Sequence, residues 1–226
     1  VGAHFLLWVI RAHGSTKFSY CEMERAVRNP VLVIMFTALV AMIGSHFHLS
    51  RPFHSLFAVL NFKSSWLSRE IVFAVSFFLV TISLLYFRFF QVHQRAIITI
   101  LGWVAISIGI VLIYCMARIY LIPTQVAWNS TTVIFSFYVT ALMLGCMAIA
   151  CLLVLDLKFA EIKKSDDIDL RADVIRYSFT GLTGMTILLV ALSFIILYIQ
   201  LRLLAQGDQI ARTSLDLLLP RYLPLF

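Results

Sequence analysis

Long stretches without a charged residue alternate with short charged segments along most of the chain. Five of these stretches cover residues 30–47, 71–87, 96–117, 131–155 and 177–201. The hydrocarbon core of a bilayer is about 30 Å thick and an α-helix rises about 1.5 Å per residue, so roughly 20 apolar residues span it. The pattern therefore predicts five transmembrane helices.

Both ends of the chain depart from this pattern. The first apolar run, residues 1–10, reaches Arg11 too soon to cross a bilayer, and we interpret it as the second half of a helix. The last residues, LLLPRYLPLF, are apolar and lack a polar tail. We therefore expect a fragment at both ends, with about six transmembrane helices, the first of them partial, in one helical-bundle domain over residues 1–226.

Composition supports an all-α integral membrane protein. The chain has 226 residues, of which 62% are hydrophobic and 13% charged, whereas soluble domains are nearer half apolar. The net charge of +7 is spread over loops between membrane segments, so we expect a lipid bilayer and no nucleic acid as its partner. The four cysteines show no CxxC spacing, and we interpret them as apolar filler that indicates no disulfide framework, iron–sulfur site or other metal site.

The distribution of positive charge predicts an orientation. Loops alternate sides, and the loops at 11–29, around residue 90 and at 156–176 together carry more lysine and arginine than the opposite set. The positive-inside rule places them in the cytoplasm. Residues 46–70 then face the periplasm from the inner membrane. The 156–176 segment is interpreted as a solvated connector without a site.

Ionisable groups converge at the predicted outer membrane level. His48 ends the second predicted helix, Glu70 opens the third, and Arg118 with Tyr120 ends the fourth. Each has an ordinary interfacial explanation, as does Trp66 in an aromatic belt. Together they suit quinol oxidation, because an imidazole with a pKa of about 6.5 can accept a hydroxyl proton and a carboxylate can relay it.

Two other functions remain open from the residues alone. A b-type haem needs two axial histidines at similar depth on facing helices, and only His4 with His46 could conceivably pair. A transporter favours polar groups at the membrane midplane, where the glycines and hydroxyls of this chain are explained more simply by helix packing.

Three segments carry a resemblance to a known family. The order HLSRP, NFKSSWLSREI and ARIY resembles the membrane anchor subunits of dimethyl sulfoxide (DMSO) reductases. There a His-Leu-Gly-Ser-Pro signature closes the second helix, a Ser-x-Leu-Ser-x-Glu segment after an Asn opens the third, and Arg-x-Tyr ends the fourth. The matching positions are His48, Leu49, Pro52, Asn61, Ser65, Leu67, Ser68, Glu70, Arg118 and Tyr120. The sequence departs from the signature at Ser50-Arg51, which stands where the family has Gly-Ser.

The resemblance implies an eight-helix anchor that oxidises menaquinol. Such an anchor has no haem or metal of its own, and it holds an iron–sulfur electron-transfer subunit and a molybdenum-cofactor catalytic subunit for the reduction of DMSO or a related acceptor. The family's proton-handling His and Glu carry over to His48 and Glu70. The quinol-binding residues expected here are His48, Glu70, Arg118, Tyr120, Asn61, Arg51 and Trp66. A polysulfide-reductase type of anchor, including one that runs in reverse as a quinone reductase, is the nearest alternative, and Arg51 leaves the terminal acceptor open.

Overall fold

A computed structural model of the chain describes residues 1–14, 17–48, 57, 59–91, 93–162, 168–207 and 209–222, and this part consists of helices joined by turns. The helices are α1 (Gly2–Gly14), α2 (Tyr20–His48), the short 3₁₀ helix η2 (Val59–Asn61), α4 (Trp66–Phe90), α5 (Arg95–Ile119), α6 (Thr131–Ile162), α7 (Ile168–Gln206) and α8 (Gln209–Tyr222). Five of them are long and apolar enough to cross a membrane. The predicted polytopic helical fold is confirmed.

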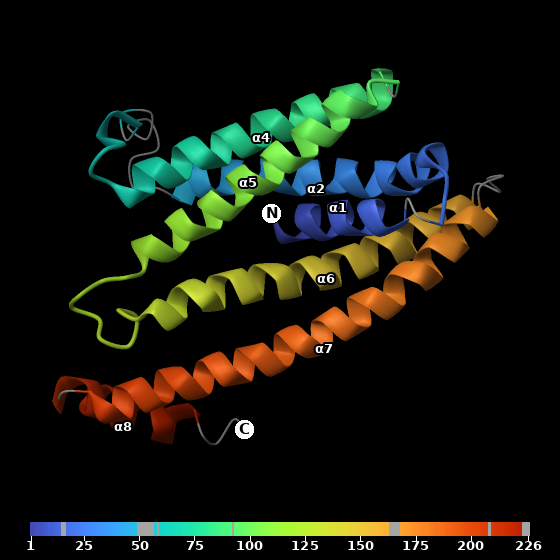
Figure 1. The fold of residues 1–226 in the computed structure, drawn as a ribbon. Helices are drawn as coiled ribbons and strands as arrows, with labels where there is room; N and C mark the ends of the chain where they lie inside the picture. The colour runs from blue at the N-terminus through green and yellow to red at the C-terminus, as the bar shows by residue number, and fades with distance from the viewer. Residues whose placement is uncertain are drawn as a thin grey trace.

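The long helices lie side by side and alternate in direction (Figure 1). α4 pairs with α5 and α6 pairs with α7, while α1 contacts α2, α5, α6 and α7 from the middle of the bundle. We call the end where α2 and α5 finish and α4 and α6 begin the Trp66 end. The opposite end, where α1 and α4 finish and α2 and α5 begin, is the Arg95 end. The alternation of loops predicted from the sequence is therefore present.

Several helices extend into segments that the sequence assigned to loops. α2 begins at Tyr20 and continues through Pro30, which is almost fully buried, whereas the apolar pattern predicted a start at residue 30. α6 continues to Ile162 and α7 starts at Ile168, so most of the predicted connector is helical. Asp156 in that segment is only 9% exposed and accepts a hydrogen bond from Asn29 Nδ2 at 2.6 Å. The prediction of a solvated connector is wrong for Asp156, because this side chain is buried against Asn29 of α2, a helix far away in the sequence.

Glycine lets α1 pack directly on the backbone of α6. A β-carbon placed on Gly145 would lie 2.6 Å from the carbonyl carbon of Gly2 and 2.7 Å from the amide nitrogen of Ala3. Small residues at such crossings let transmembrane helices approach closely. The hydrophobic core around this crossing includes Leu6, Leu7, Cys146 and Ile149. Gly145 thus fixes how deeply α1 sits in the bundle.

Gly145→Ala is therefore expected to destabilise the bundle by about 1–3 kcal/mol, because the added methyl group meets backbone that cannot move aside. Gly184→Ala is the matched control, since a β-carbon on Gly184 meets nothing within 4 Å. Denaturant unfolding in detergent measures both. Equal free energies of unfolding for the two variants would contradict the close α1–α6 contact.

Candidate functional site

The first turn of α4 is held in place by its own loop. Ser65 has extended backbone and caps the helix, accepting a hydrogen bond from the Ser68 amide at 3.3 Å. Arg69 donates to the carbonyls of Phe62 and Lys63 at 3.0 and 2.6 Å, which ties the segment after η2 to the helix. Capping and these bonds satisfy backbone groups that a helix start and a loop otherwise leave free. They position Trp66 and Glu70, one turn apart, at the Trp66 end.

Trp66 is the meeting point of α4 and α5. Its ring makes an edge contact with Tyr114 at 5.7 Å, and the guanidinium of Arg118 lies over it at 4.8 Å. Arg69 approaches the same ring at 4.2 Å. Guanidinium groups are attracted to the faces of aromatic rings, most strongly tryptophan. The ring therefore orients Arg118, whose buried Nε has no hydrogen-bond partner among the described residues.

Glu70 is half-buried and lies one helical turn after Trp66 on α4. The buried Cys115 thiol on α5 lies within electrostatic range of both Arg69 and Glu70. A half-buried carboxylate, an arginine with an unused donor and an aromatic wall are thus close together. Such a group can hold a flat, polar-edged molecule and move a proton.

The remaining predicted residues are placed differently. Asn61 ends η2 with an exposed side chain, and its carbonyl accepts from the amides of Ser64 and Ser65 at 3.1 and 2.9 Å. Tyr120 turns toward α6, where its ring contacts Trp128 at 6.0 Å and Phe137 at 5.3 Å. His48 is the last residue of α2, and its side chain lies outside the described residues, as does the whole of Arg51.

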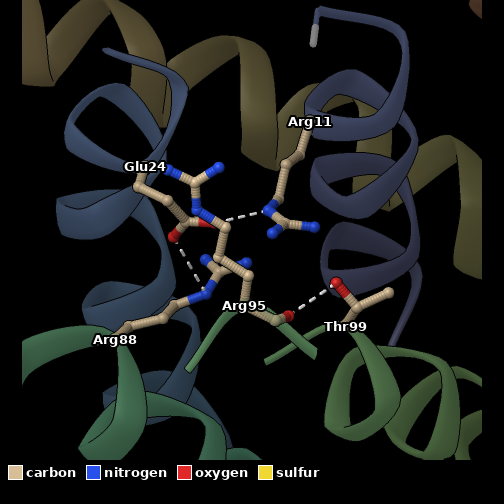
Figure 2. A network of polar contacts seen from close by, with 5 residues as sticks. All are labelled: Arg11, Glu24, Arg88, Arg95 and Thr99. Carbon is tan, nitrogen blue, oxygen red and sulfur yellow. Dashed lines mark hydrogen bonds and ion pairs between the residues drawn. The ribbon is translucent and has the colours of Figure 1, made fainter. Parts of the chain in front are cut away.

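A second polar group, not foreseen from the sequence, lies at the Arg95 end (Figure 2). Glu24 on α2 forms an ion pair and hydrogen bond with Arg11 Nε on α1. The other oxygen of Glu24 lies 3.4 Å from Arg88 Nε on α4. Arg11, Glu24 and Arg88 are 8%, 7% and 5% exposed. One carboxylate thus joins three helices.

Aromatic rings surround this ion pair network. Arg11 lies 4.5 Å above the Trp8 ring, and Arg88 lies 5.7 Å from the same ring. Arg95 on α5 lies 4.5 Å from the Tyr20 ring, with Arg11 at 5.2 Å. We call Arg11, Arg88 and Arg95, with Glu24 between them, the arginine cluster. The sequence did not predict this cluster, because its members are far apart in the chain and the apolar pattern assigned Glu24 to a loop.

His4 is also buried within the bundle. It is 3% exposed, its ring packs edge-on against Phe77 of α4 at 5.7 Å, and neither ring nitrogen has a hydrogen-bond partner among the described residues. Among all the residues that the structure describes, no group of three or more His, Cys, Asp or Glu side chains is arranged to hold a metal ion.

The helices and the two polar ends define a polytopic membrane protein with its candidate chemistry at the membrane surfaces. The sequence profile of the DMSO reductase anchor subunit (DmsC) family matches residues 16–164, which is more than half of the chain. The chain belongs to this family, which implies a membrane anchor of a DMSO reductase complex. Neither the curated proteins nor the solved structures that were compared gave a significant match.

Proposed function

We propose that the chain binds menaquinol at the Trp66 end, oxidises it, and passes the electrons to an iron–sulfur subunit of a molybdenum-cofactor enzyme. The observation that carries the proposal is the contact of Trp66 with Arg118, with Glu70 one turn further along α4, within a family-matched region. All seven predicted quinol-binding residues lie between residues 16 and 164.

The proposed chemistry divides between the residues by type. Trp66 and Tyr114 form an aromatic wall for a flat head group, and the unused Nε donor of Arg118 holds one of its oxygens. His48, at the end of the neighbouring α2, accepts a hydroxyl proton, and Glu70 relays it to the surface. Oxidation of one quinol releases two protons and two electrons in all. We further propose that this face is periplasmic, so that the protons leave outward and oxidation alone stores no transmembrane charge.

Asn61 and Arg51 are proposed to shape the entrance, and Tyr120 to support it from the α6 side. Asn61 lies in the segment that Arg69 ties to α4, so its position is coupled to that of Trp66. The partner subunits would dock at the same end, close enough to receive electrons. The catalytic subunit then determines which terminal acceptor is reduced.

Binding of a menaquinol analogue to the assembled complex tests this proposal. Titration of an analogue that does not turn over should show one saturable site, lost in Glu70→Gln and retained in Arg212→Gln, which changes an exposed residue of α8. Equal saturable binding by the two variants would remove Glu70 from the site. A complex without saturable binding would exclude quinol as the substrate of this chain.

Arg118→Gln is expected to raise the KM for quinol by about 10- to 100-fold with a smaller change in kcat, because it removes a charged hydrogen-bond donor from the head group. Steady-state quinol oxidation by the complex measures both constants. Arg212→Gln again serves as the control. A fall in kcat without a change in KM would contradict the binding role of Arg118.

A further inference from the structure

Among the described side chains, the arginine cluster has three guanidinium groups and only one carboxylate. Three guanidinium groups, those of Arg11, Arg88 and Arg95, surround Glu24 (Figure 2). Arg11 and Arg88 share this carboxylate, and two of the three arginines are more than nine-tenths buried. Unbalanced charge in a poorly hydrated site is costly, so such a site stabilises a bound anion.

Arg88 also has hydrogen-bond donors without acceptors. Its Nε is 3.4 Å from Glu24 but outside hydrogen-bond geometry, and its Nη1 has no partner among the described residues. Of the six buried side-chain atoms that lack a partner in the described part of the chain, five belong to His4, Tyr20 and Arg88. Buried donors are nearly always satisfied in native proteins. The Tyr20 hydroxyl and the Arg88 Nε and Nη1, which lie at the Arg95 end, therefore lack acceptors among the described residues, whereas His4 lies in the middle of the bundle against Phe77.

The cluster is reachable from the membrane surface. Arg95 is exposed and is the first residue of α5, a helix whose first turn has no acidic residue and whose N-cap, Gln94, makes no side-chain capping bond. A cation at this position is unfavourable for the helix dipole unless an anion is close. Arg88 lies near the last turn of α4 and Glu24 near the first turn of α2, so the cluster lies at the depth of lipid head groups.

Tyr20 supplies a further hydrogen-bond donor at the arginine cluster. Burial first, and then the negative charge of Glu24, raise the pKa of the Tyr20 hydroxyl above its usual value of 10.0. The hydroxyl therefore keeps its proton at neutral pH and remains able to donate a hydrogen bond.

We propose that the arginine cluster binds a phosphate group at the Arg95 end, supplied by an anionic phospholipid or by free phosphate. Arginine forks match phosphate oxygens with two parallel hydrogen bonds, and a phosphate can accept from several donors at once. Arg95 and Tyr20 receive the group at the surface, and Arg88 and Arg11 provide the buried charge. Basic pockets between transmembrane helices hold lipid head groups in this way. The site is independent of quinol binding, which lies at the other end of the bundle.

The test uses the assembled complex, stripped of lipid in detergent. Short-chain phosphatidylglycerol, diacylglycerol with the same chains, and inorganic phosphate are titrated separately, with bound ligand counted by native mass spectrometry. Phosphatidylglycerol should saturate one site, and diacylglycerol should not. Arg88→Gln and the exposed Arg95→Gln should each weaken binding about tenfold or more, as expected for loss of a charged hydrogen bond. Arg202→Gln, an exposed arginine bonded to Tyr198, should bind like the unchanged protein.

The arms separate the two sources of phosphate. Saturation by phosphatidylglycerol alone assigns the site to lipid, and saturation by inorganic phosphate alone assigns it to the free ion. If Arg88→Gln does not assemble, the proposal is tested by comparing ligand binding by Arg95→Gln with ligand binding by Arg202→Gln. Equal binding by these two, saturable binding of diacylglycerol equal to that of phosphatidylglycerol, or saturation by neither phosphatidylglycerol nor inorganic phosphate would overturn the proposal.

Discussion

Replacing His48 with alanine should lower quinol oxidation by about 10²- to 10⁴-fold, the usual contribution of a general base, while the complex still assembles in the membrane. The change removes the proposed proton acceptor at the end of α2 but leaves the Trp66, Glu70 and Arg118 group intact. Quinol-dependent reduction of the terminal acceptor by membranes, compared with reduction by an artificial electron donor, measures the effect.

His93→Ala is the matched control, because His93 is an exposed histidine in the turn between α4 and α5 at the Arg95 end. It should leave quinol oxidation unchanged. If His48→Ala retains the normal quinol rate in an assembled complex, the proton step belongs to another residue. If both donors lose activity together, the variant has lost a partner subunit, which contradicts the expectation that His48→Ala still assembles.

Glu24→Gln should destabilise the bundle by about 3–5 kcal/mol, the cost of leaving a buried ion pair without one member. Both Arg11 and Arg88 lose their carboxylate, and the contact between α1, α2 and α4 weakens with them. Unfolding of the detergent-solubilised protein, followed by loss of helical signal, reports the free energy.

Glu161→Gln removes the same charge from an exposed position on α6 and should change the stability by less than about 1 kcal/mol. The difference between the free energies of unfolding of the two variants separates the effect of the buried ion pair from the effect of losing one negative charge. Similar stabilities for Glu24→Gln and Glu161→Gln would show that the carboxylate of Glu24 does not hold the helices together.

The sequence predicted the membrane helices well, because an uninterrupted apolar run leaves few alternatives in a bilayer. It failed where charge lies inside a helix. Residues 20–29 read as a loop, although Arg11 and Arg88 neutralise Glu24 within α2. Periodicity along one segment cannot reveal a partner contributed by another helix. Asp156, paired with Asn29, was missed for the same reason.

The candidate site was predictable in part. Family resemblance pointed to Glu70 and Arg118, and Trp66 was expected at the same membrane level; the structure places Trp66 with Arg118 through a ring contact between α4 and α5. Tyr120 and Arg118 were grouped because both end the same predicted helix and match the family's Arg-x-Tyr. The two are neighbours at the end of α5, but Arg118 turns to α4 and Tyr120 turns to α6. The proposed role of His48 stays a prediction.

The close crossing of α1 and α6 also affects how the chain is made. α1 ends at Gly14 and its main partner begins at Thr131, so at about 5–20 residues per second the ribosome needs roughly ten seconds to supply that partner. During this interval Arg11 and His4 already have their partners Glu24 on α2 and Phe77 on α4, but α1 lacks its packing surface on α6. The packing of α1 against α6 is therefore completed only after α2, α4 and α5 have been synthesised.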